Sequence, residues 1–297
     1  EGVSTFIWPP AGISLAVLLL YGYRFLPGMF LGAFLASLLY GAPLPVAISS
    51  GIGSTITPFL AAFIAKKFFK FNNVLQHTRD AVGLFLVGVP LSSIILASLI
   101  TFGFLRGGLI EAATLPAVWL SVWVCNILSA NIIGATILVW SKQWKIRFST
   151  QKRFWESVAL IVFYALMSLL MFTNAVEKSI SLLYLIFVPL VWAALRFGIR
   201  EVVTIIFVFS VMALWSTLGG MNPALTGDVN TTILYLEGFI SVVLFISMIL
   251  AITVAQRKEY EQRKDNFISM ASHELKTPLT SVKMMTQVLV KKNKDKE

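Results

Sequence analysis

Between Thr232 and Ala255 the chain reads TILYLEGFISVVLFISMILAITVA, and residues 256–265 continue with QRKEYEQRKD. The only charged side chain in the first stretch is that of Glu237. About 20 mostly apolar residues in an α-helix cross the hydrocarbon core of a bilayer. The sequence therefore predicts a membrane-spanning helix that leaves the membrane near Ala255 and continues into water as a charged helix.

The composition places most of the remaining chain in the membrane as well. Hydrophobic residues make up 57% of the 297 residues and charged residues 13%, whereas soluble domains carry roughly 25% charged residues. The single cysteine, Cys125, excludes an internal disulfide framework and a multi-cysteine metal site. We expect the bilayer to be the solvent for most of the chain, with membrane lipid as a partner and no bound metal.

Apolar runs of sufficient length occur about nine times, which predicts an all-α fold, a polytopic transmembrane helical bundle. Pro9 and Pro10 are expected to delay the helical part of the first run. The expected spans are Ser4–Leu20, Phe25–Tyr40, Leu44–Ala65, Val82–Phe104, Pro116–Trp140, Ser157–Phe172, Ile180–Leu195, Val202–Leu218 and Thr232–Ala255.

The charges of the loops predict the orientation of these spans. One set of alternate loops carries nearly all the basic residues, and the opposite set carries only Arg106 and Lys178. By the positive-inside rule the basic loops and the C-terminus are cytoplasmic. These loops and the C-terminal end account for the net charge of +10, so no nucleic-acid partner is expected. The basic set is Arg24, Lys66, Lys67, Lys70, Arg79, Lys142, Lys145, Arg147, Lys152, Arg153, Arg196 and Arg200.

The loops on the opposite, outer side are short. None of them is long enough to hold a separate ligand-binding domain. Any signal must therefore be detected within the membrane or at its rim. These loops are Gly41–Pro43, Leu105–Leu115, Thr173–Ser179 and Gly219–Thr231.

A second informative stretch, residues 267–279, reads FISMASHELKTPL. Apolar residues recur here and beyond at alternating spacings of three and four, the a/d pattern of a helix that packs into a bundle or coiled coil. With Ile268 at position a, His273 falls at f, away from this seam and toward water, and Thr277 lies one turn later on the same face. The seam residues are Ile268, Ala271, Leu275, Pro278, Val282, Met285 and Leu289.

A water-facing histidine followed directly by an acid suits nucleophilic chemistry. A neutral imidazole can attack a γ-phosphate, and a carboxylate on its other nitrogen can hold the tautomer and take up the proton. The alternative is an exposed histidine that merely precedes Glu274 on an amphipathic helix. The coincidence of the seam, the acid, Thr277 and Pro278 favours the chemical interpretation.

Residues 272–279, SHELKTPL, resemble the H-box of the dimerisation and phosphotransfer (HisKA) domain of bacterial sensor histidine kinases. The resemblance implies a homodimer in which His273 is phosphorylated from ATP, with Mg, and passes the phosphoryl group to an aspartate of a cognate response regulator. It assigns assistance in autophosphorylation to Glu274 and phosphatase support to Thr277. It also implies that Pro278 loosens the helix.

The same resemblance requires a second hairpin helix and a separate ATP-binding domain. The chain ends at Glu297, and no glycine-rich phosphate cradle occurs in its polar part. We therefore expect a piece of a protein-histidine kinase truncated after the H-box, which binds no cofactor and is inactive alone. It is expected to serve as a substrate for a catalytic domain supplied in trans.

Three segments of the membrane part resemble MASE1, a bacterial integral-membrane sensory domain. They are FIWPPAGI at 6–13, GMFLGAF at 28–34 and PLVWAALRFG at 189–198. The expected organisation is a MASE1-like sensor over 1–255, a helical signalling linker over 256–266 and the first HisKA helix over 267–297. The resemblance implies location in the bacterial inner membrane and names no ligand.

Polar residues inside the spans are the sensor candidates. Glu237 is the foremost, because an intramembrane carboxylate is costly and often functional, although a headgroup-level acid is the alternative. Asn126 and Asn131 either line a polar cavity or hydrogen-bond neighbouring helices. Pro58, Pro90 and Pro189 are expected to kink their spans. The kinks either open backbone groups that a ligand could use or merely help the helices to pack.

Two other functions are compatible with part of the sequence. Kinked helices in a multi-span protein also occur in transporters and channel-like proteins, whose substrate sites lie at discontinuous helices. The MASE1 resemblance also extends to receptors fused to diguanylate cyclases. The H-box at His273 argues against both.

Overall fold

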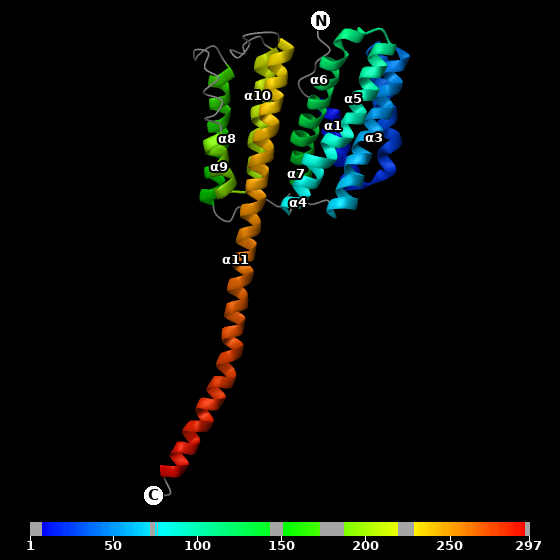
Figure 1. The fold of residues 1–297 in the computed structure, drawn as a ribbon. Helices are drawn as coiled ribbons and strands as arrows, with labels where there is room; N and C mark the ends of the chain where they lie inside the picture. Colours follow the sequence, from blue (N-terminus) through cyan, green and yellow to red (C-terminus); the bar gives the residue numbers. More distant parts are fainter. Residues whose placement is uncertain are drawn as a thin grey trace. The chain divides into compact units, whose positions relative to one another are not determined.

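The computed structural model describes residues 8–71, 75, 77–142, 151–172, 187–218 and 229–294. This part of the chain is α-helical and contains no strand (Figure 1). The chain divides into two units, Glu1–Thr253 and Val254–Glu297. The predicted all-α fold is confirmed.

Prolines begin the first helices of the membrane unit. Pro9 and Pro10 stand at the start of α1, where the missing N–H groups would have no helical partner anyway. The predicted late start of the first helix is therefore confirmed. Pro27 and Pro45 occupy the same place in the next two α-helices. These elements are α1 (Pro9–Tyr21), η1 (Tyr23–Phe25), α2 (Leu26–Leu39) and α3 (Leu44–Phe69).

Two π-helical segments interrupt the helices that follow. Val82–Gly88 (η2) ends two residues before Pro90, whose missing N–H leaves the carbonyl oxygen of Leu86 without its regular helical donor. Ala130–Gly134 (η4) contains Asn131. The other elements of this part are α4 (Thr78–Ala81), α5 (Val89–Arg106), η3 (Ala112–Thr114), α6 (Leu115–Ser129) and α7 (Ala135–Lys142).

The last part of the membrane unit is built around α10 (Ile199–Leu218), which packs against α7, α8 (Gln151–Phe172) and α9 (Phe187–Arg196). The indole of Trp140 donates to the hydroxyl of Thr204 at 3.1 Å, so α7 and α10 are joined by a hydrogen bond. The final helix, α11 (Val229–Lys294), is a single helix with Pro278 inside it, and it belongs to both units (Figure 1).

Small residues let the helices of the membrane unit approach closely, as is usual in a bilayer. A Cβ on Gly12 of α1 would lie 2.6 Å from the carbonyl oxygen of Ser129 and 2.8 Å from the backbone nitrogen of Gly134. On the outside, large side chains such as Leu39 and Leu31 are exposed, as expected of surfaces that face lipid. The packing is therefore tight inside and apolar outside.

Each of the nine predicted spans overlaps a described helix. Residues 4–7 of the first span and 180–186 of the seventh span lie outside the described residues. Four helical stretches of the described chain are long and apolar enough to cross a membrane: Leu44–Phe69, Thr78–Arg106, Ala112–Ser141 and Glu237–Thr280. Shorter apolar helices are Pro9–Tyr21, Tyr23–Leu39 and Phe154–Leu166. The count of nine therefore stays a prediction.

Candidate functional site

Most described side chains of α11 beyond Val254 are exposed, and local ion pairs lie on the surface of this stretch. Arg257 Nε lies 3.0 Å from Glu261 Oε1, and Arg263 pairs with Glu259. Such pairs four residues apart stabilise exposed helices by a few tenths of a kcal/mol each. They contribute to the stability of this exposed helical stretch.

His273 and Glu274 are both exposed on this helix. The imidazole is therefore accessible to a phosphoryl donor, as the heptad position predicted. Pro278 stands inside the helix and cannot donate to the carbonyl oxygen of Glu274, four residues before it. This interrupts the hydrogen-bond ladder one turn from the histidine. The side chain of Thr277 lies outside the described residues.

The predicted seam is uncovered in the single chain. Ile268 is 52% exposed and Leu275 is 63% exposed. Phe267, Met270 and Leu279, which stand off the seam, are also exposed, so the exposed apolar side chains are not confined to the a/d positions. Exposed apolar side chains along the predicted seam indicate an interaction site. The side chains of Val282, Met285 and Leu289 lie outside the described residues.

The membrane candidates differ in how their polar atoms are satisfied. Glu237 of α11 is completely buried, and both carboxyl oxygens lack a hydrogen-bond partner. Asn131 in η4 is buried with its Oδ1 atom unpartnered. Asn126 of α6 donates from Nδ2 to Ser93 Oγ on α5 at 2.7 Å. Asn126 therefore joins two helices by a hydrogen bond, which is one of the two roles expected from the sequence.

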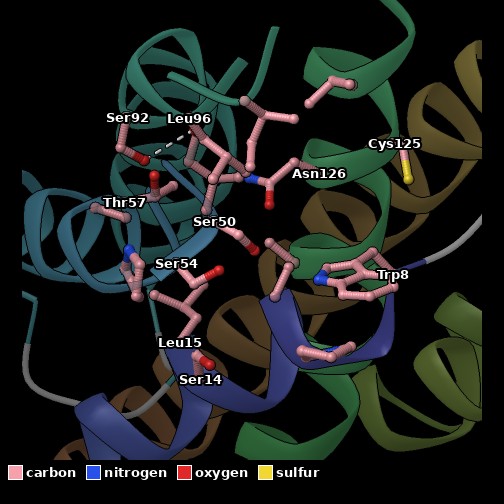
Figure 2. Close-up of a pocket in the computed structure, with 18 of the residues that line it drawn as sticks. Trp8, Ser14, Leu15, Ser50, Ser54, Thr57, Ser92, Leu96, Cys125 and Asn126 are labelled. Atoms are coloured by element: carbon pink, nitrogen blue, oxygen red, sulfur yellow. Dashed lines mark hydrogen bonds between the residues drawn. The ribbon is translucent and has the colours of Figure 1, made fainter. Parts of the chain in front are cut away.

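Asn126 also lines a cavity of about 240 Å³ between α1, α3, α5 and α6 (Figure 2). Glu237 and Asn131 do not line it, so the structure does not bring the three candidates together. Thr57, Ser50 and Ser54 of α3 also line the cavity, and the sequence did not identify them as candidate site residues. Their only sequence signal is a run of small hydroxyl and glycine residues in α3, a pattern that more often serves helix packing.

Comparison with protein families assigns both units. Residues 1–258 match MASE1, and residues 263–297 match the His Kinase A (phospho-acceptor) domain, HisKA. The chain belongs to the MASE1 family. With MASE1 followed by HisKA, it is a membrane sensor of the histidine-kinase class of two-component systems. Neither the curated proteins nor the solved structures gave a match to this chain.

The family assignment confirms the resemblance drawn from the H-box and from the three membrane segments. HisKA is a dimerisation and phosphotransfer domain. A second copy of the chain is therefore consistent with the exposed apolar side chains of α11. The residue roles assigned to His273, Glu274 and Thr277, and to the membrane candidates, stay predictions.

Proposed function

We propose that this MASE1 chain senses a signal within the membrane and controls phosphorylation of His273 by ATP, followed by transfer to a response-regulator aspartate. The observation that carries the proposal is the position of His273. It is exposed on a helix matched to the phosphoacceptor domain, and the same helix, α11, begins in the MASE1 region.

In the proposed reaction an imidazole nitrogen of His273 attacks the γ-phosphorus of ATP. The N–P bond forms while the bond from phosphorus to the bridging oxygen of ADP breaks, and the imidazole proton passes to Glu274. Mg²⁺ bound with ATP would neutralise charge on the phosphates. The phosphoryl group then moves from His273 to an aspartate oxygen of the regulator, which restores the imidazole.

The partners follow from the exposed surfaces. Two chains pair along the apolar face that contains Ile268 and Leu275, as a homodimer, and the ATP-binding domain reaches His273 from outside this face. The C-terminal helix lies in the cytoplasm of a bacterial cell, because the basic loops predict that side and because ATP and regulators are there. Thr277 would support dephosphorylation of the regulator.

The test is phosphotransfer in trans. The chain is mixed with the ATP-binding domain of a related histidine kinase and labelled ATP, and acid-labile, base-stable phosphate on the chain is measured. We expect label on the wild type and none on His273→Gln. The chain has two histidines, so His77→Gln is a matched control that should keep the label. Label that persists in His273→Gln, or that disappears in His77→Gln alone, would contradict the assignment.

A further inference from the structure

The cavity between α1, α3, α5 and α6 is lined by hydroxyl and amide groups in an otherwise apolar wall (Figure 2). In Figure 2 the side chains of Ser50, Ser54 and Asn126 turn toward one another across its centre. No Asp, Glu, Lys, Arg or His is among the described residues that line it. Such a wall suits a neutral molecule and disfavours an ion, whose burial without a counter-charge is costly.

Thr57 is the residue that points to an occupant. Its side chain is 6% exposed, and its Oγ1 atom has no hydrogen-bond partner. Hydroxyls in membrane helices usually donate to a carbonyl in the preceding turn, as Thr101 does to Ala97 at 2.6 Å. A buried hydroxyl without a hydrogen-bond partner lowers the stability of the fold unless a molecule in the cavity forms a hydrogen bond with it.

Pro58 removes a backbone donor next to Thr57. Proline has no backbone N–H, so the carbonyl oxygen of Ser54, four residues earlier, lacks the donor that it would have in a regular helix. Both residues line the cavity. A carbonyl oxygen only accepts hydrogen bonds, whereas the Thr57 hydroxyl can donate or accept. A ligand with a hydroxyl or N–H group therefore matches the hydrogen-bonding groups of this cavity.

The volume limits the size of this occupant. An apolar cavity of about 150 Å³ binds benzene, so 240 Å³ accommodates about ten non-hydrogen atoms by simple scaling. Aromatic and aliphatic side chains, such as Leu15, Leu96 and Phe104, make up much of the remaining wall. An apolar body with one polar end fits both parts.

We infer that this cavity binds a small, neutral, amphiphilic alcohol or phenol, whose hydroxyl pairs with Thr57 and the Ser54 carbonyl. The idea that such a molecule is the signal rests on the proposed sensor function. The idea that the cavity binds it is independent of that function. The site lies within the MASE1 region, where the short outer loops require any signal to be detected. Ligands of this class partition into the bilayer, so they reach membrane-embedded helices at a raised local concentration.

Equilibrium dialysis tests the binding directly. The chain in lipid nanodiscs is dialysed against 1-naphthol, naphthalene or 1-naphthalenesulfonate, with empty nanodiscs as the reference for partition into lipid. We expect saturable excess binding of 1-naphthol, about tenfold weaker binding of naphthalene, which lacks the hydroxyl, and no excess binding of the sulfonate. No saturable excess of 1-naphthol, or a preference for the sulfonate, would overturn the inference.

Two pairs of variants locate the binding. Thr57→Val should weaken 1-naphthol about tenfold and leave naphthalene unchanged, whereas Thr101→Val, a buried threonine outside the cavity, should change neither. Ser54→Leu should fill the cavity and abolish binding of both, whereas Thr55→Leu, the next residue on α3, should retain it. Unchanged 1-naphthol affinity in Thr57→Val and in folded Ser54→Leu would exclude this cavity.

The dialysis needs no ATP and no phosphorylation. Failure to bind therefore leaves the assignment of His273 intact, and failure to label His273 leaves the binding result intact. The two proposals are tested independently.

Discussion

At the scale of single residues, the two conspicuous acids occupy opposite environments. Glu274 is exposed beside His273, whereas Glu237 is completely buried with both oxygens unpartnered. A group that assists proton transfer must reach the reacting imidazole, which an exposed neighbour can do. A buried acid without a partner lowers stability, so its presence in α11 points to a role other than packing.

Replacement of Glu274 separates its role from that of Thr277. Glu274→Gln keeps the size of the side chain but removes the base, so labelling of His273 in trans should slow roughly 100-fold or more. Thr277→Ala should leave this labelling unchanged and slow the dephosphorylation of a phosphorylated response regulator. Both rates are followed by loss or gain of label over time. Equal slowing of both reactions in both variants would contradict the separate roles.

Replacement of Glu237 should improve folding while it damages signalling. Glu237→Met removes a buried polar group that has no partner, so the free energy of unfolding should rise by about 1–3 kcal/mol. Thermal or denaturant unfolding in detergent measures the change. Ser241→Ala, one turn along α11 with another unpartnered hydroxyl, is the matched control and should be near neutral for signalling. Lower stability in Glu237→Met would indicate that the carboxyl group makes a stabilising interaction.

At the scale of helices, close packing depends on particular glycines. Gly12 of α1 faces the backbone of Ser129 and Gly134, which cannot move aside as a flexible side chain can. Gly32 of α2 has nothing within 4 Å of the position of an added Cβ. The two glycines are alike in sequence context, since both stand in apolar helices, and differ only in what lies against them.

The same substitution should therefore have opposite effects at the two sites. Gly12→Ala should destabilise the membrane unit by about 1–3 kcal/mol, because overpacking forces α1 away from η4. Gly32→Ala should be neutral or stabilise by up to about 1 kcal/mol, because alanine is the better helix former. Unfolding in detergent compares them. A loss of stability at Gly32 as large as at Gly12 would contradict the packing described for α1.

The helices were predictable from sequence and much of their contact pattern was not. Apolar run length predicted a helix at every expected span, and the heptad pattern predicted that His273 would be exposed, because both depend on local sequence. Thr57 and Ser54 were missed because a cavity forms between helices that are distant in sequence. Asn126 was recognised as a candidate because a buried amide is conspicuous in an apolar run, whereas a serine is not.

At the scale of the whole chain, the membrane unit and the phosphoacceptor region share α11. Contacts within the membrane unit connect its earlier helices, which include those that line the cavity, to the helices that follow. Trp140 of α7 bonds Thr204 of α10, and the hydroxyl oxygens of Thr78 in α4 and Thr253 in α11 lie 3.4 Å apart. A change in the packing of the early helices thus has physical routes to α11.

If α11 transmits the signal as a rigid helix, the angular position of His273 relative to the membrane unit should determine the kinase rate. One residue inserted after Glu261 rotates everything beyond it by about 100° and lengthens the helix by only about 1.5 Å. Seven residues lengthen it by about 10 Å and return the angle to within about 20°. The two insertions therefore separate rotation from length.

We expect the one-residue insertion to disturb labelling of His273 strongly and the seven-residue insertion to restore it in part. The measurement is the rate of His273 labelling from ATP in a protein extended through the ATP-binding domain, with a regulator-dependent transcriptional reporter in cells as the second readout. Since Gln256–Asp265 contains no glycine or proline, the inserted residues should be alanine and charged residues that keep the helix. Equal activity in both insertions would exclude the rigid helix and would require a flexible joint between the MASE1 region and His273.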